Sequence, residues 1–270
     1  MAMKLTRFKY QLLVAALVLM AASSCQKVID IKVDNAATQL VIEGNVTNST
    51  IIQTVKISQS VPFTNTNTFP PVRGATVTIA DNKGTTYKLT ETTTPGTYGT
   101  PKFAGRIGFI YTVTVITNGV TYTGSSTMPA MVNFDQLTYR DDFFNNNLTK
   151  LISVHFQDPP NVANQYRFVL YVNSAQVKTI FDANDTFTDG GYVDLDLFQN
   201  DIKIKLGDTV KVEMQCIDKN IFTYWYSLSQ QNNNGGGNST TPSNPPSNLS
   251  NNALGYFSAH TTQTQTVIIN

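Results

Sequence analysis

The feature that most constrains this chain is a repeated alternation of apolar and polar residues in short runs separated by turn signals. The runs 53–59 (QTVKISQ), 75–81 (ATVTIAD) and 109–117 (FIYTVTVIT) alternate as half-buried strands do. Asp81-Asn82-Lys83-Gly84 and Asn118-Gly119 are hairpin turn sequences. About seven short strands in about 90 residues predict a small β-sandwich over residues 39–129.

Charge is scarce in this chain, which fits strands joined by polar turns better than amphipathic helices. Charged residues make up 14% of the sequence, against about 25% in typical globular domains. The formal net charge of +1 gives no electrostatic basis for a nucleic-acid partner.

The N-terminus has the layout of a secretory signal peptide over residues 1–24. Three basic residues precede an apolar run of 11 residues at 12–22, which is too short to span a bilayer. Small residues then lead to Cys25, and this arrangement resembles a bacterial lipoprotein signal, in which the cysteine is acylated. The alternative is a soluble secreted protein with a chance cysteine. Removing residues 1–24 leaves 16 basic and 18 acidic residues, a net charge of −2.

A second β-rich block is predicted after Pro129. We assign residues 25–38 to a lipid-anchored tether, 39–129 to the first sandwich and 130–270 to a second β domain. Four further runs carry strand patterns: 151–157, 166–173, 192–197 and 209–216.

One short helix is expected at residues 218–230 (DKNIFTYWYSLSQ), with Asp218 as its N-cap. The consecutive residues Tyr224, Trp225 and Tyr226 point in different directions from a helix. They form a possible binding surface, or the helix plugs the open end of a sandwich. Residues 231–250 are low in sequence complexity and are expected to form a flexible insertion, and 253–260 and 264–269 are expected to form two closing strands.

Residues that could support catalysis or bind metal are sparse. His155 and His260 could share a zinc ion only if their strands pair. The stretch 182–196 offers oxygens from Asp182, Asn184, Thr186 and Asp189, but its spacing fails the EF-hand pattern, which favours a hairpin with solvated acids. No nucleophile elbow, zinc-protease motif or phosphate loop is present. We therefore expect no enzyme activity, no cofactor and no metal, and we expect Cys216 to be a small buried hydrophobe.

The order of several stretches resembles a known family. They are 24–31 (SCQKVIDI), 40–47 (LVIEGNVT), 74–81 (GATVTIAD), 95–100 (PGTYGT), 111–115 (YTVTV), 120–130 (VTYTGSSTMPA), 222–231 (FTYWYSLSQQ) and 253–260 (ALGYFSAH). Together they resemble the outer-membrane lipoproteins of Bacteroidota grouped as domain-of-unknown-function family 4249. The resemblance covers nearly all of the mature chain and supplies no catalytic residues.

The resemblance implies an all-β fold, with an immunoglobulin- or transthyretin-like sandwich followed by a second β-sandwich-like domain. It also implies neighbours such as TonB-dependent outer-membrane transporters. We therefore expect a lipid-anchored outer-membrane accessory or binding protein that acts with such a transporter. A stand-alone glycan- or peptide-binding module and a structural envelope protein are the alternatives. The side of the membrane, the ligand and the oligomeric state stay open.

Overall fold

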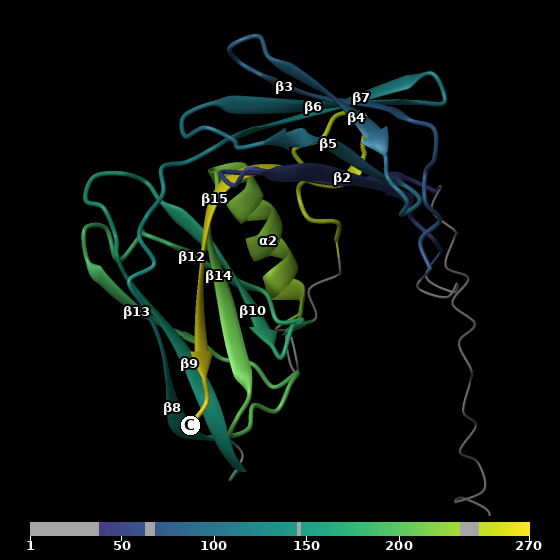
Figure 1. Ribbon diagram of the computed structural model, residues 1–270. Helices are drawn as coiled ribbons and strands as arrows, with labels where there is room; N and C mark the ends of the chain where they lie inside the picture. Colours follow the sequence, from purple (N-terminus) through teal and green to yellow (C-terminus); the bar gives the residue numbers. More distant parts are fainter. Residues whose placement is uncertain (1–37, 63–67, 145–146, 233–242) are drawn as a thin grey trace, which may run out of the picture. The chain divides into compact units, whose positions relative to one another are not determined.

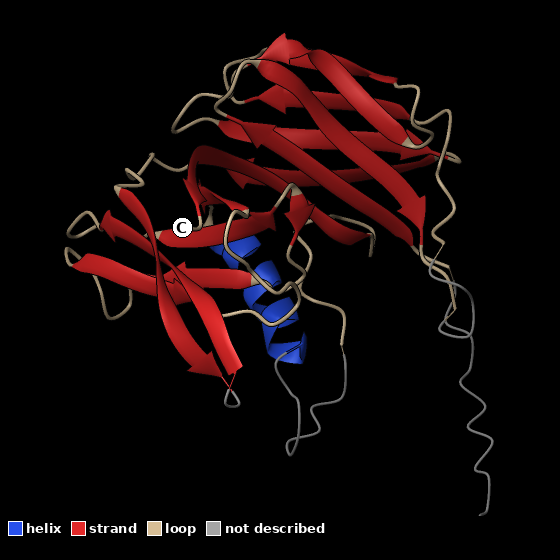
Figure 2. Ribbon diagram, turned by 60° about the horizontal axis from the view of Figure 1, so that its bottom comes forward, coloured by secondary structure: helices blue, strands red, loops and turns tan. Residues whose placement is uncertain are grey.

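The structure is a computed structural model that describes residues 38–62, 68–144, 147–232 and 243–270 (Figure 1). Cys25, the signal residues 1–24 and the tether residues 25–37 lie outside these ranges. The described chain is all-β with one helix, as Figure 2 shows. The strand patterns in the sequence therefore predicted the fold class correctly.

Seven strands form the first part of the fold, the number expected from the turn spacing. They are β1 (Leu40–Thr47), β2 (Ile51–Gln59), β3 (Thr76–Asp81), β4 (Thr86–Glu91), β5 (Thr97–Phe103), β6 (Ile110–Thr117) and β7 (Val120–Thr127). Their hydrogen-bonded order is β1-β2-β5-β4-β3-β6-β7. Alternate side chains from these strands fill one apolar core, which includes Ile42, Val55, Ile57, Val77 and Val113.

The turn chemistry of this part agrees with the sequence. Asn118 and Gly119 have φ values of 49° and 76°, which the tight turn between β6 and β7 requires. At the β3–β4 turn, the Asp81 carboxylate accepts hydrogen bonds from the backbone N–H groups of Lys83 and Thr85, both at 2.9 Å. These two turns set the register of their hairpins.

A second apolar core lies between a three-stranded sheet and the far end of the large sheet. The strands concerned are β8 (Gln136–Phe144), β9 (Asn147–Gln157), β10 (Gln165–Val172), β11 (Ala175–Gln176), β12 (Phe181–Asn184), β13 (Tyr192–Leu197) and β14 (Thr209–Cys216). The small sheet has the order β13-β9-β8, while β10, β11, β12 and β14 belong to the large one. Phe156, Phe168, Leu170 and Val212 are among the residues buried between them.

The C-terminal strand β15 (Leu254–Ile268) runs through both parts of the fold. Its first half pairs parallel with β1 and its second half pairs antiparallel with β14. The prediction of two closing strands is therefore wrong: one strand of 15 residues is present. No turn residue interrupts it, and its middle residues, Thr261 and Thr262, are compatible with continuous β-structure. Ala253, Phe257 and Ala259 pack into the first core, so residues from the end of the chain complete the sandwich.

The expected hairpin across residues 182–196 is also wrong. Strand β12 pairs with β10 in the large sheet, whereas β13 pairs with β9 in the small one. The residues between β12 and β13 therefore connect two sheets, and Asp182 and Asp194 of this stretch lie on strands of different sheets.

The helix, α2 (Lys219–Asn232), lies where the sequence placed it and contacts β10, β12 and β15 (Figure 1). Within the predicted insertion 231–250, residues 233–242 lie outside the described ranges. Residues near the end of that insertion are held against β7: Leu249 bridges to Gly124, and the Asn248 side-chain amide donates to Ser125 O at 2.9 Å.

Candidate functional site

The start of α2 is fixed by Asp218, as its sequence position predicted. One carboxylate oxygen accepts hydrogen bonds from the N–H groups of Asn220 and Ile221, at 2.9 and 3.0 Å. This is N-cap geometry, which satisfies donors that the first helical turn leaves free. The other oxygen accepts from the Ser126 hydroxyl and, at 3.1 Å, from the Thr127 N–H on β7. Asp218 therefore both begins the helix and ties it to the first part of the fold.

The three consecutive aromatic residues do not form one surface. Tyr224 and Trp225 are half-buried against Tyr256 of β15, with ring centroids 5.1 and 5.0 Å away. Tyr226 points elsewhere, is 47% exposed and stacks on Phe222 at 5.6 Å. A consecutive run on a helix spans about 200° of its circumference, so only Tyr226 is left to the solvent. The helix docks with two of these rings and presents the third.

Arg167 on β10 lies beneath the helix. Its guanidinium is 3.7 Å from the centroid of the Trp225 ring, a cation–π contact. Its Nη1 donates to Gln215 Oε1 at 3.2 Å, while its buried Nε finds no hydrogen-bond partner among the described residues. Burial lowers the pKa of Arg167 below its ordinary value. The sequence did not single out this residue, because an isolated arginine in a strand gives no motif.

A second polar group, His260 of β15, is also buried in this part of the fold. It is 2% exposed, and its Nδ1 lies 2.9 Å from the Ser258 hydroxyl. Burial, and then the positive charge of Arg167, lower the pKa of His260 to about 3. The ring is therefore neutral at physiological pH.

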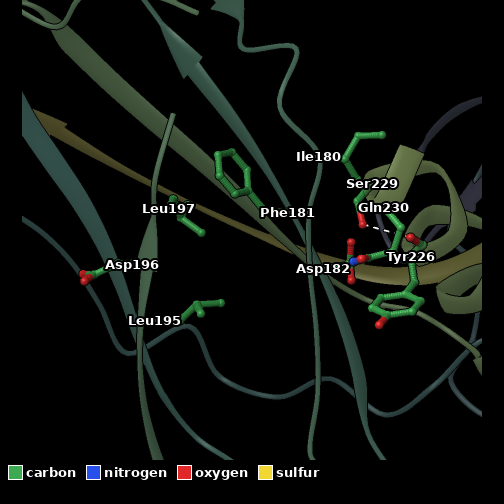
Figure 3. A pocket seen from close by; sticks show the side chains of 9 residues that line it. All are labelled: Ile180, Phe181, Asp182, Leu195, Asp196, Leu197, Tyr226, Ser229 and Gln230. Carbon is green, nitrogen blue, oxygen red and sulfur yellow. Dashed lines mark hydrogen bonds between the residues drawn. The ribbon is translucent and has the colours of Figure 1, made fainter. Parts of the chain in front are cut away.

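A cavity of about 250 Å³ opens beside α2 (Figure 3). Three segments that are distant in the sequence line it. They are residues 180–182 at β12, 195–197 at β13, and Tyr226, Ser229 and Gln230 of α2. Arg167 and Asp182 are aligned partners in the β10–β12 ladder. The cavity thus adjoins the strand that carries the buried arginine.

Asp182 is the half-buried acid of this cavity. Burial raises its pKa above the ordinary value, and a hydrogen bond with Ser229 and the charge of Arg167 oppose that rise. The Ser229 hydroxyl also lies 2.9 Å from the Tyr226 carbonyl oxygen. The Ser229 hydroxyl has one proton and donates it to one acceptor at a time. Ser229 can therefore keep its hydrogen bond to the Tyr226 carbonyl oxygen while Asp182 accepts a hydrogen bond from a ligand.

The second acid of the lining, Asp196, is already paired. Arg140 donates to its two oxygens at 2.7 and 2.6 Å, and Ser153 donates at 2.6 Å. These contacts, the Arg140 hydrogen bond first, lower the pKa of Asp196. The two acids thus differ: Asp196 is ionised and paired with Arg140, whereas Asp182 is partly desolvated.

A separate group of acids lies at the end of β9. Oxygens of Asp158, Asp185 and Asp189 lie within 4.8 Å of one another, and this is the only such group of three candidate ligands in the described ranges. Asp158 is fully buried and accepts from the Tyr166 hydroxyl and from Gly190 N–H at 3.3 Å. Carboxylate oxygens are ligands that calcium prefers, but each of these already accepts a bond from the protein.

The sequence suggests Asp182, Asn184, Thr186 and Asp189 as oxygen donors, and the structure does not bring this set together. Only Asp189 enters the acidic group, because Asp182 belongs to β12 and faces the cavity. Asp158 was missed because it lies in a loop 24 positions before Asp182. No spacing motif could have connected them.

The two histidines are held separately. His155 on β9 bonds to Thr138 at 2.6 Å and faces Asp194, while His260 lies on β15, and β9 and β15 do not pair. The condition for a shared zinc site is therefore not met. Cys216 is free and 4% exposed, and burial raises the pKa of its thiol, as expected of a core residue.

In the described part of the chain, no helix has the length and apolarity that crossing a membrane requires. No curated protein matches the sequence. A family model described as a domain of unknown function, DUF4249, matches residues 26–266. Because this match covers nearly the whole chain, the protein belongs to the DUF4249 family.

Proposed function

We propose that this protein is a lipid-anchored binding protein of the outer membrane that works with a TonB-dependent transporter. The observation that carries the binding role is the cavity beside α2, which combines a half-buried acid, Asp182, with a solvent-exposed ring, Tyr226. A concave site with a few convergent polar groups and a perturbed acid is the usual form of a ligand site. No catalytic step is proposed.

The membrane part of the proposal rests on Cys25 and the signal-like residues before it. Acylation of this cysteine with more than one chain would hold the protein stably on a bilayer, at about 0.8 kcal/mol per buried CH₂. Fourteen residues lie between Cys25 and Leu40, the first residue of β1. Fully extended, they would reach about 50 Å. The fold could therefore meet a partner embedded in the same membrane.

The anchor is tested by expressing Cys25→Ala in the native host and separating membrane from soluble material. Wild type should sediment with the outer membrane, and the variant should move to the soluble fraction. A Cys216→Ala variant is the matched control, because it removes the other cysteine and should leave the distribution unchanged. Sedimentation of Cys25→Ala with the membrane would contradict lipid anchoring.

The transporter is tested by affinity capture of the tagged full-length protein from native membranes in mild detergent. The expected result is recovery of a large outer-membrane barrel with wild type and its loss with Cys25→Ala, which no longer reaches the membrane. Repeated captures of wild type without a barrel would refute the transporter part and leave the binding role to be judged by ligand measurements.

A further inference from the structure

The cavity beside α2 has a mixed apolar and polar lining. Figure 3 shows Phe181, Leu195 and Leu197 toward β13, with Asp196 beyond them, and Asp182, Ser229, Gln230 and Ile180 toward α2. Leu195 is half-buried, whereas Phe181 and Leu197 belong to the second core and are 9% and 1% exposed. A purely apolar ligand would cover the polar side and leave its groups without hydrogen bonds, which is unfavourable. A strongly hydrated ion would gain nothing from the leucines and Phe181. The lining therefore suits a molecule with one apolar face and one edge of hydrogen-bonding groups.

The charges of the lining are compensated from within the protein. Asp196 is paired with Arg140 at 2.6 Å. Asp182 is aligned with Arg167 across the β10–β12 ladder, and the arginine charge favours the ionised form of this acid. A cationic ligand would compete with Arg140 at Asp196 and be repelled by the charge of Arg167 near Asp182, and an anionic ligand would meet two carboxylates. Charge complementarity thus favours a neutral ligand.

Tyr226 supplies a flat surface at the rim. One side of its ring stacks on Phe222, which fixes its orientation, and the residue is 47% exposed. An oriented, exposed aromatic ring binds C–H faces by dispersion and apolar contact at little entropic cost. The cavity volume, about 250 Å³, falls just below the range of about 300–1,000 Å³ that holds drug-sized ligands. The site matches a single ring with substituents rather than a polymer buried along its length.

We infer that the α2 cavity binds one neutral sugar ring, whose hydroxyls donate to Asp182 and bond with Gln230 while its C–H face lies against Tyr226. This inference rests on the proposed binding role and narrows it to a ligand class. The ring would be a free monosaccharide or the end unit of a longer glycan, since the rim at Tyr226 is open to solvent. The Ser229 hydroxyl would remain bonded to the Tyr226 carbonyl when the sugar occupies Asp182.

The test uses saturation-transfer difference NMR and calorimetry on the detergent-solubilised full-length protein. The probes are the methyl glycosides of glucose, galactose, mannose and N-acetylglucosamine, with glucosamine as the cationic comparison and glucuronate as the anionic one. At least one neutral glycoside should bind, and the charged analogue of the same ring should bind at least about tenfold more weakly.

Two variants report on the two sides of the ligand. Tyr226→Ala removes an exposed ring and should weaken binding about three- to tenfold. Asp182→Asn removes a charged acceptor and should weaken it about tenfold or more. The matched controls are Tyr192→Ala and Asp194→Asn, an exposed ring and a carboxylate on β13 that do not line the cavity. Both controls should bind as wild type does.

The inference is overturned if no neutral glycoside binds, if charged analogues bind more tightly, or if Tyr226→Ala binds as wild type does. If Asp182→Asn does not fold, Tyr226→Ala alone tests the inference. Tyr226 is not part of either apolar core, so its replacement should leave the protein folded. If a charged or apolar probe binds and its binding depends on Tyr226, the inference of a neutral sugar ligand is refuted, but the proposed binding role is retained. Barrel recovery in the capture experiment is independent of every one of these outcomes.

Discussion

The buried His260 should make this protein lose stability in mild acid by an amount that can be calculated. Its pKa is about 3 in the folded protein and 6.5 in the ordinary reference state. Between these values the unfolded chain binds a proton that the folded protein excludes, so the free energy of unfolding falls as the pH drops below 6.5. For these two pKa values, the loss is roughly 2 kcal/mol at pH 5 and roughly 4 kcal/mol at pH 3.

The measurement is urea denaturation at pH values from 7.5 to 5, with wild type compared with His260→Asn. The amide of asparagine can keep the contact that Nδ1 makes with Ser258 but does not titrate. The variant is expected to be less stable than wild type by a constant offset at neutral pH, because the side chain is smaller. The stability difference between the two should shrink by roughly 2 kcal/mol from pH 7.5 to pH 5. Parallel pH profiles would refute the assignment of His260 as a buried, neutral ring.

Three further predictions concern the helix, the C-terminal strand and the cavity. Asp218→Ala should lower the free energy of unfolding by about 2 kcal/mol, because it removes the cap and the link to β7; urea denaturation of the variant and of wild type would measure it. Gly255→Ala should lower the free energy of unfolding by at least about 3 kcal/mol, since φ is +91° and the new Cβ would lie 2.1 Å from the Ile42 carbonyl oxygen. Thermal unfolding of this variant is compared with that of Gly108→Ala, where φ is also positive but no atom lies near the new Cβ. The difference between the two variants separates the steric clash from the backbone strain. Asp182→Asn should gain stability relative to wild type as pH rises from 3.8 through the raised pKa of Asp182, because the wild-type carboxyl then loses its proton in a site that favours the protonated form; a stability difference between the two proteins that does not change with pH would contradict it.

The parts of the fold that follow local rules could be predicted from the sequence. The β6–β7 hairpin follows from Asn118-Gly119 between alternating runs, and α2 follows from Asp218 ahead of its apolar residues. Strand β8 was missed because its sequence, QLTYRDDFF, carries adjacent charges and no regular alternation. The sequence predicts two strands in place of β15, because the polar residues in its middle resemble a connection between strands. Polar side chains in its middle, such as His260, are instead buried inside the fold.

The candidate site could not be predicted because it exists only through tertiary structure. Tyr226 was identified as an aromatic residue of the helix, but its separation from Tyr224 and Trp225 depends on which face of α2 docks. Asp182 and Gln230 lie 48 positions apart in the sequence, and no spacing rule connects them. Their meeting requires that β12 join β10 and that α2 cross the same face of the sheet.

Arg167 connects the docking of the helix to the charge of the cavity, and the two roles can be separated. Its guanidinium stacks on Trp225 and its charge acts on Asp182, yet its Nε is buried without a partner in the described structure. Replacing a buried charge by an apolar side chain of similar volume is often neutral for stability, so Arg167→Met should leave the helix docked. The same change removes the cation that lowers the pKa of Asp182, and that pKa should rise further. If Arg167 served only to hold the helix, Arg167→Met would loosen α2 and leave the titration of Asp182 unchanged. A folded variant with a higher Asp182 pKa, measured by NMR titration of the carboxyl carbon, would show instead that this arginine is retained for the cavity.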